Sequence, residues 1–139
     1  MRKDRRMKSL IVEDDPTSRF MLQQLLVPFG EVCLAEKGTE AIGAFVIARR
    51  KRAPFDLVCL DIMLPEMDGQ EVLRTIRSLE ETEGILRGDG VKVIMTTVLD
   101  DKDHIFSSFR EFCDGYLIKP FDKAKLMEHL NNFGLIDAQ

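Results

Sequence analysis

Five short apolar runs, each followed by a stretch with helical periodicity, constrain this sequence more than any other feature. This alternation is typical of an α/β domain built on a parallel sheet. The strands are expected at residues 8–12, 31–35, 56–60, 91–96 and 115–118. The third and fourth runs are rich in Val, Leu, Ile and Met with little alternation, which indicates strands that helices cover on both faces.

Five helices are expected, over about 16–27 and 39–50, from 68–69 onward, over 101–112, and from 122 onward. Pro16 suits a first helical turn. The third helix places its apolar residues on one face, and the fourth does the same with Ile105, Phe109 and Phe112. Residues 80–90 carry three glycines, which predicts an exposed loop before the fourth strand.

The length and charge of the chain exclude several functional classes. Its 139 residues fit a single domain over 1–139, with a basic tail at 1–7 and a short tail at 134–139. A net charge of −4 and a pI near 5.2 argue against direct binding of nucleic acid. No stretch is apolar over the length of a bilayer, and the start lacks the apolar segment of a signal peptide. We therefore expect a cytoplasmic protein without a membrane contact.

Polar residues gather where the expected strands end. They are, in chain order, Glu13, Asp14 and Asp15 after the first strand, Asp61 after the third, Thr97 after the fourth, and Lys119 with Pro120 after the fifth. In a parallel sheet all these ends lie on one edge, which is where such sheets bind ligands. We therefore expect several carboxylates, a hydroxyl and an ammonium group to converge.

The charges of this set predict its chemistry. Clustered carboxylates repel one another, and a divalent cation resolves that repulsion. Mg²⁺ is typically held by one or two carboxylates and leaves positions for phosphate oxygens. Asp61 is then available as a nucleophile that forms an aspartyl-phosphate, with Lys119 as a point charge and Thr97 as a hydroxyl donor for the phosphoryl oxygens. Each residue alone has an ordinary structural role, such as helix capping, but their convergence favours a site.

The residues quoted next carry a resemblance to a known family. They are LIVEDDP at 10–16, AEKGTEAI at 35–42, FDLVCLDIMLPEMDG at 55–69, VIMTT at 93–97 and DGYLIKPF at 114–121. Over nearly its whole length the chain resembles the receiver domain of bacterial response regulators, the phosphoacceptors of two-component signalling. The resemblance implies a flavodoxin-like, doubly wound, five-stranded parallel sheet of order 2-1-3-4-5 with helices on both faces.

The resemblance also implies a role for individual residues. Asp61 matches the phosphorylated aspartate, and Glu13 and Asp14 match the acidic pair that positions Mg²⁺, with Mn²⁺ as an alternative ion. The backbone carbonyl of Met63 is a further expected metal ligand, whereas Asp15 lies just past the acidic pair and is not expected to be one.

Further positions match the switch residues and the cis peptide of the family. Thr97, rather than Thr96, takes the place of the switch hydroxyl, and Tyr116 that of the switch aromatic. The bond between Lys119 and Pro120 resembles the cis peptide of the family.

The function implied is that of a stand-alone receiver, because only one helix and a short tail are expected over 122–139. A sensor histidine kinase or a phosphotransfer protein would donate the phosphoryl group to Asp61. The signal would then pass to an unidentified partner protein or along a phosphorelay, and the domain would be a monomer or weak dimer. We do not expect an enzyme, apart from its own phosphorylation and slow autodephosphorylation.

Three other interpretations remain. A flavodoxin-type cofactor binder would share the fold, but the loop Glu-Asp-Asp-Pro at 13–16 would repel an anionic cofactor. A phosphatase with an aspartate nucleophile needs an acid/base partner, and Met63 occupies the usual place of that partner. A receiver-like scaffold that never accepts phosphate is the third.

Some features of the sequence depart from the family pattern or stand outside it. Val98 replaces a small residue after the switch threonine, and Phe112 with Cys113 stands where Gly-Ala is common. The stretch 80–90 is longer than in compact members. The basic runs MRKDRR and ARRKR are best interpreted as solvated charge, with contact to an acidic surface as the alternative.

Overall fold

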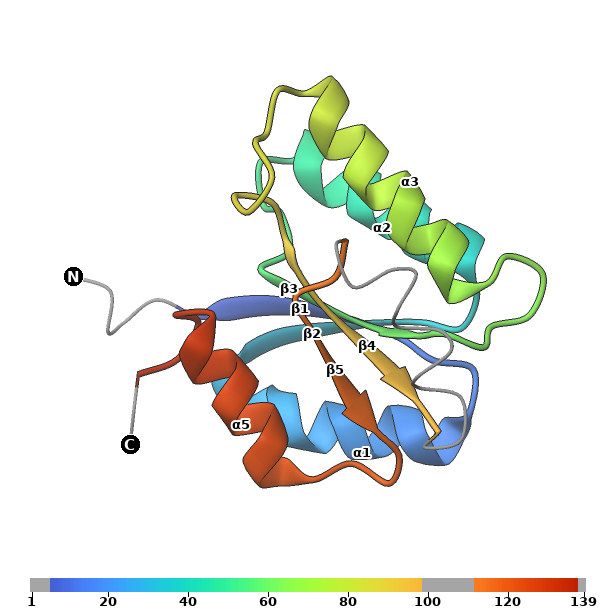
Figure 1. The fold of residues 1–139 in the computed structure, drawn as a ribbon, viewed down its shortest axis with the longest axis vertical. Coiled ribbons are helices and arrows are strands. Elements are labelled where there is room, and N and C mark those ends of the chain that lie inside the picture. Colours follow the sequence, from blue (N-terminus) through green and yellow to red (C-terminus); the bar gives the residue numbers. More distant parts are fainter. Residues whose placement is uncertain (1–5, 99–111, 138–139) are drawn as a thin grey trace.

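In the computed structural model, which describes residues 6–98 and 112–137, a five-stranded sheet forms the middle layer (Figure 1). The strands are β1 (Met7–Val12), β2 (Gly30–Ala35), β3 (Leu57–Asp61), β4 (Lys92–Thr97) and β5 (Gly115–Ile118). Every neighbouring pair is parallel, and the order is β2-β1-β3-β4-β5. The predicted fold class and strand order are therefore confirmed.

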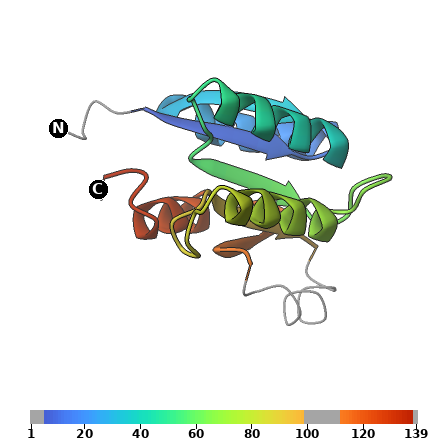
Figure 2. The same ribbon diagram turned by 90° about the horizontal axis from the view of Figure 1, so that it is seen from above.

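Helices cover both faces of this sheet. The helices α1 (Pro16–Leu26) and α5 (Lys123–Asn132) lie on one face, and α2 (Gly38–Arg50) and α3 (Gly69–Thr82) lie on the other, where Figure 2 shows the latter two side by side. A short 3-10 helix, Val27–Phe29, follows α1. The helix expected over 101–112, with Ile105 and Phe109, falls mainly outside the described residues.

Two buried clusters, one under each pair of helices, explain the unbroken apolar run of β3. Val58 and Leu60 pack into the cluster shared with α2 and α3, whereas Leu57 and Cys59 pack into the one shared with α1 and α5. All five residues of β3 are buried, including Asp61. No helix within residues 6–98 and 112–137 is long and apolar enough to cross a bilayer.

Three aspartates fix where helices begin on the carboxyl side of the sheet. The carboxylates of Asp15, Asp68 and Asp122 accept backbone N–H bonds at the first turns of α1, α3 and α5, with donor–acceptor distances of 2.9, 3.0 and 2.9 Å. Such caps satisfy amides that a helix cannot pair internally. They hold the loops that surround the strand ends.

The boundaries of some expected elements differ in the structure. Asp61 and Thr97 are the last residues of β3 and β4 rather than the residues after them. The expected loop over 80–90 also begins later, because α3 continues to Thr82. Glu80, expected in that exposed loop, is buried with 4% of its surface exposed.

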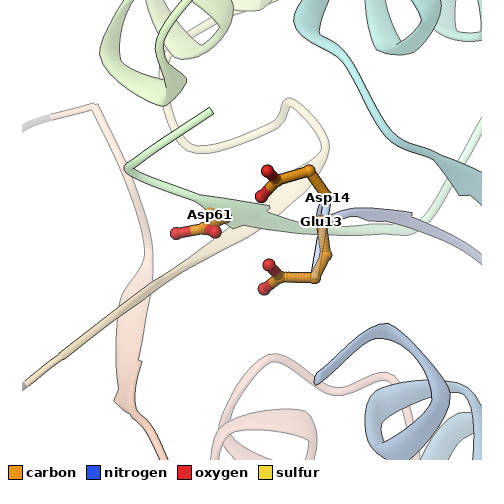
Figure 3. Close-up of side chains that lie close together, drawn as sticks. All are labelled: Glu13, Asp14 and Asp61. Carbon is orange, nitrogen blue, oxygen red and sulfur yellow. The ribbon is translucent and has the colours of Figure 1, made fainter. Parts of the chain in front are cut away.

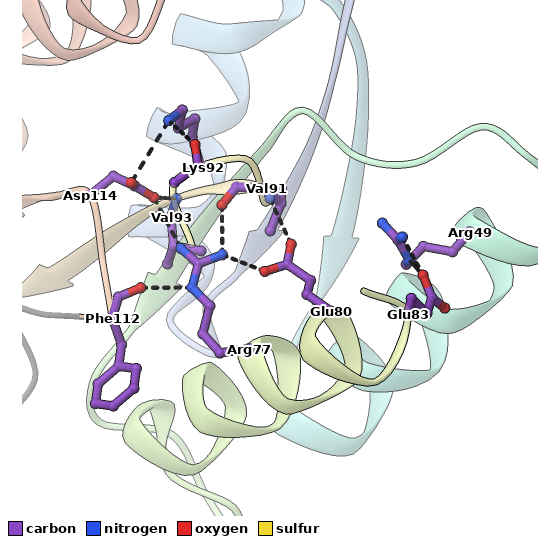
Figure 4. Close-up of polar contacts among 10 residues, drawn as sticks. Arg49, Arg77, Glu80, Glu83, Val91, Lys92, Val93, Phe112 and Asp114 are labelled. Carbon is purple, nitrogen blue, oxygen red and sulfur yellow. Dashed lines mark hydrogen bonds and ion pairs between the residues drawn. The ribbon is translucent and has the colours of Figure 1, made fainter. Parts of the chain in front are cut away.

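The burial of Glu80 depends on Arg77, one turn earlier in α3 (Figure 4). Arg77 Nη1 lies 2.8 Å from Glu80 Oε1, and the other carboxylate oxygen accepts the Val91 N–H at 2.7 Å. The same guanidinium donates to the Phe112 and Val91 carbonyls and to Asp114 Oδ2, at 2.8, 2.9 and 3.0 Å. Arg77 therefore ties α3 to the segments that lead into β4 and β5.

Candidate functional site

The sheet order brings the expected acidic residues together. In the ladder between β1 and β3, Val12 is the partner of Leu60, so Glu13 emerges beside Asp61. Figure 3 shows Glu13, Asp14 and Asp61 close together at the carboxyl ends of these two strands. One carboxylate oxygen from each of the three lies within 4.8 Å of the others. Glu13 and Asp61 are buried, whereas Asp14 is exposed.

Lys119 reaches this cluster from the edge strand β5. Its Nζ lies 2.8 Å from Glu13 Oε1 and 3.2 Å from Asp61 Oδ2. Its backbone N–H donates to the Thr97 carbonyl at 2.7 Å, which continues the β4–β5 pairing past Ile118. The Lys119–Pro120 peptide bond is cis. One ammonium group thus contacts carboxylates from two central strands.

The loop after β3 supports Asp61 through its backbone. The Met63 N–H donates to Asp61 Oδ1 at 3.1 Å, and the Gly69 N–H donates to the Ile62 carbonyl at 2.9 Å. A Cβ on Gly69 would lie 2.2 Å from the Asp61 carbonyl oxygen, so only glycine allows α3 to begin this close to β3. The sequence predicts a helix start at 68–69 but not this close approach, for which the Asp-Gly pair is the available signal.

Burial and crowding disturb the charge of Glu13. Burial, the largest cause, and the neighbouring Asp61 together raise the pKa of its carboxyl group to about 7, while Lys119 acts in the opposite direction. Burial by itself would lower the pKa of the Lys119 ammonium, but its contacts with Glu13 and Asp61 outweigh burial and raise it. The protonated form of Glu13 is therefore favoured at neutral pH more strongly than in an exposed glutamate.

The donor set fits a hard divalent cation. Three carboxylates face one ammonium group, and Glu13 Oε1 is buried without a hydrogen bond, although it lies within ion-pair distance of Lys119. Oxygen ligands with excess negative charge are what Mg²⁺ binds in proteins. The residues present can thus hold such an ion.

The remaining expected site residues lie around this cluster without joining it in the described structure. The Thr97 side chain is buried, and its hydroxyl donates to the Val98 carbonyl at 3.2 Å. Tyr116 on β5 is 44% exposed, and its carbonyl lies 3.0 Å from His129 Nε2. Asp15 caps α1 through Ser18, so its carboxylate is engaged away from the cluster.

A family model described as the response regulator receiver domain matches residues 9–131 of this chain. The chain belongs to the receiver family. Receiver domains are phosphoacceptor modules that take phosphate from histidine kinases or phosphotransfer proteins, and the family in general depends on Mg²⁺. The predicted family is therefore confirmed.

Individual relatives agree with this assignment. The chain is 34% identical over 121 residues to the probable transcriptional regulatory protein SilR of Salmonella typhimurium. The aligned region covers 87% of this chain but only 48% of SilR. The chain thus spans about half the length of that relative. It is 31% identical over 130 residues to the chemotaxis protein CheY-3 of Vibrio cholerae, which covers 92% of each chain.

Solved receivers also have the same architecture. A response regulator receiver domain protein from Clostridium thermocellum superposes with a TM-score of 0.72 at 26% sequence identity, over 91% of this chain and 93% of that one. The likeness extends over nearly the whole sheet and its helices.

Proposed function

We propose that this chain acts as a single receiver domain that accepts a phosphoryl group on Asp61. The observation that carries the proposal is the setting of Asp61, buried at the end of β3 between Lys119 Nζ and the Met63 amide, with Glu13 and Asp14 beside it. A buried carboxylate among further acids and one cation has little structural use, whereas it suits a nucleophile for phosphorus.

In the proposed reaction a carboxylate oxygen of Asp61 attacks the phosphorus of the donor. The new bond joins an Asp61 oxygen to phosphorus while the bond from phosphorus to the donor atom breaks. That leaving atom is a histidine nitrogen in a kinase or phosphotransfer protein and an acyl oxygen in acetyl phosphate. No atom is oxidised or reduced. Lys119, 3.2 Å from Asp61, is placed to offset charge on the transferred group. Beyond its own phosphorylation and slow autodephosphorylation, the domain is not expected to be an enzyme.

Metal dependence belongs to the same proposal. Glu13, Asp14, Asp61 and the Met63 carbonyl would hold Mg²⁺, or Mn²⁺ in its place. When bound, the ion neutralises the carboxylates and the phosphoryl oxygens. Glu13 must be ionised to serve as a ligand, so its raised pKa makes metal binding weaker in acid.

The proposed readout passes through Thr97 and Tyr116. Phosphorylation acts by biasing an element with two arrangements, and only through contacts that differ between them. The Thr97 hydroxyl, which donates a hydrogen bond to the Val98 carbonyl in this structure, would turn to the phosphoryl group. Tyr116 on the adjacent strand would then repack. A separate partner protein, or the next protein of a phosphorelay, would then read the changed surface, with the domain itself a monomer or weak dimer.

Intact-mass measurement after incubation with acetyl phosphate and Mg²⁺ tests the phosphoacceptor. Wild-type protein should gain one phosphoryl group, and chelation of Mg²⁺ should prevent the gain. The Asp61→Asn variant should gain none, whereas Asp89→Asn, the same change in an exposed turn, should behave like wild type. Labelling of Asp61→Asn would refute the assignment, and an unlabelled wild type would favour a scaffold that never accepts phosphate.

Amide NMR shifts with and without beryllofluoride and Mg²⁺ test the readout. Shifts should appear at Thr97 and along β5, including Tyr116 and its contact His129 on α5. Shifts confined to the residues around Asp61 would contradict a switch through Tyr116.

A further inference from the structure

A cluster of cations lies near the amino end of β1, on the side of the sheet opposite the strand ends that carry the Asp61 site. Arg50 ends α2, Lys51 and Arg52 follow it, and all three are exposed. Lys8 joins them from β1, because its Nζ donates to the Ala53 carbonyl at 2.8 Å. Lys8, Arg50, Lys51 and Arg52 form what we call the basic patch. It lies beside the beginning of β1, whereas Asp61 lies at the end of β3 (Figure 1).

The acids around the basic patch offset only part of its charge. Asp56 accepts the Lys8 N–H at 2.8 Å, and Glu31 is the partner of Lys8 in the β1–β2 ladder. Arg49 is not part of the patch, since it forms an ion pair with Glu83 of the segment after α3. A local excess of positive charge therefore remains on a chain whose net charge is −4.

An apolar side chain stands among these cations. Ile47 is 52% exposed and lies three residues before Arg50 and four before Lys51 in the same helical segment. Residues with that spacing are neighbours on one face of a helix. The exposed face at the end of α2 thus combines an apolar anchor with flanking positive charge, which is the complement of an acidic segment that carries an apolar residue.

The backbone at Arg52 gives an independent observation. Its φ is 60°, its N–H donates to the Arg49 carbonyl at 3.0 Å, and the Ala53 N–H donates to the Ala48 carbonyl at 2.9 Å. This is the Schellman ending of a helix, whose left-handed residue is usually glycine. A side chain in that conformation costs about 1 kcal/mol. A cation thus stands where glycine would be more stable.

We propose that the basic patch, together with Ile47, docks an acidic segment of a partner protein whose apolar residue contacts Ile47. Charge complementarity selects this occupant. Nucleic acid is a poorer match, because the chain is acidic overall with a pI near 5.2. The distance from the Asp61 edge lets the segment stay bound while the phosphorylation state of Asp61 changes. Docking is therefore a tether, separate from the phosphorylation proposed above.

Fluorescence anisotropy with a labelled Glu/Asp-rich peptide that carries one central leucine tests the proposal. Wild-type protein should bind it more weakly as salt rises. The double variant Arg50→Glu, Lys51→Glu should bind about tenfold more weakly. Lys123→Glu, Lys125→Glu makes the same change in net charge at exposed positions of α5 and should keep most of the affinity. Equal losses in the two double variants would overturn the proposal.

Two single variants separate docking from structural roles. Ile47→Ser should weaken peptide binding several-fold without changing its salt dependence. Arg52→Gly should weaken binding and yet raise the melting temperature, because it relieves the left-handed strain. A gain in stability with unchanged affinity would show that Arg52 takes no part in docking.

Competing ligands and the phosphorylation assay complete the test. Tighter binding to duplex DNA or to phosphatidylserine vesicles than to the peptide, with the same sensitivity to Arg50→Glu, Lys51→Glu, would overturn the assignment of an acidic protein segment. Absence of peptide binding at low salt would do the same. The double variant should still be labelled by acetyl phosphate, so failure of docking is distinguishable from failure of phosphorylation at Asp61.

Discussion

Two buried carboxylates, Glu13 and Glu80, lie at opposite ends of the strands of the same sheet, Glu13 after the end of β1 and Glu80 near the beginning of β4. They differ in how their charge is neutralised. Glu13 is 0% and Glu80 4% exposed, and each pairs with one cation, Lys119 and Arg77 respectively. In chemical type the two pairs are nearly alike. Their surroundings are not.

Both oxygens of Glu80 have hydrogen bonds, one from Arg77 and one from the Val91 amide. Glu13 shares its only ammonium partner among the described residues with Asp61, and its Oε1 has no hydrogen bond. A satisfied buried pair holds segments together, whereas an under-neutralised cluster retains capacity for a ligand. The difference teaches that burial of charge alone does not identify a functional site; the unmet charge does.

The largest expected effect comes from breaking the satisfied pair. Arg77→Met should lower the free energy of unfolding by about 3–5 kcal/mol, because it leaves Glu80 buried without its cation. Urea denaturation would measure this. The double variant Arg77→Met, Glu80→Leu should recover part of the loss, and Lys123→Met on exposed α5 is the control. If Arg77→Met lowered the free energy of unfolding by less than about 1 kcal/mol, as for an exposed ion pair, the contrast drawn here between Glu80 and Glu13 would fail.

The next effect is a pH dependence at Glu13. Because its folded pKa is raised from 4.5 to about 7, the folded state keeps the proton longer than the unfolded chain. Its contribution to stability is therefore full below pH 4.5 and is lost as pH rises to about 7. Relative to Glu13→Gln, wild type in metal-free buffer should lose about 3 kcal/mol across that range. If the stability of the two proteins changed with pH in the same way, the pKa of Glu13 would not be raised by its surroundings.

A somewhat smaller effect concerns Mg²⁺. At a concentration a hundredfold above its dissociation constant, the ion should stabilise wild type by about 2.7 kcal/mol. Thermal unfolding should show the increment lost in Asp61→Asn but kept in Glu80→Gln, even though the latter starts from lower stability. Equal increments in all three proteins would place the ion somewhere other than the Glu13 cluster.

The smallest effect tests how tightly Glu80 is held. A Cβ on Gly90 would lie 2.2 Å from Glu80 Oε1, and that carboxylate is fixed by Arg77 and Val91. Gly90→Ala should therefore cost about 1 kcal/mol, the low end for overpacking, because a side-chain end can yield slightly. Gly43→Ala, in α2 with open space around it, should instead stabilise the protein. Chemical denaturation of both variants gives the comparison, and a neutral Gly90→Ala would mean that the Glu80 network is loose.

The sequence predicted one of these two edges and missed the other, for a physical reason. Strand ends in a parallel sheet share an edge, so Glu13, Asp61 and Lys119 could be expected to meet once the apolar runs were identified. Glu80 follows a helix and precedes three glycines, a pattern typical of an exposed loop. Its burial depends on Arg77 in the preceding turn and on the space that Gly90 leaves, and neither shows in a local pattern.

Other features of the site also needed the structure. The raised pKa of Glu13 comes from its depth beneath the strand ends, which composition does not report. The direction of the Thr97 hydroxyl, toward Val98, is a rotamer choice that no spacing encodes. His129 contacts the Tyr116 carbonyl and stacks on the Phe133 ring, and its place in the helical pattern indicates neither contact.

The order of the strands divides the Asp61 site unequally along the chain. Glu13 and Asp61 precede the segment between α3 and β4, whereas Lys119 follows it. A cut in that segment would leave the carboxylates on one fragment and the ammonium group on the other, with β4 and β5 separated from β3. Transfer of a phosphoryl group would then require the two pieces to reassemble edge to edge. If Asp61 is the phosphoacceptor as proposed above, covalent labelling of one fragment would record its encounter with the other, as in a split reporter.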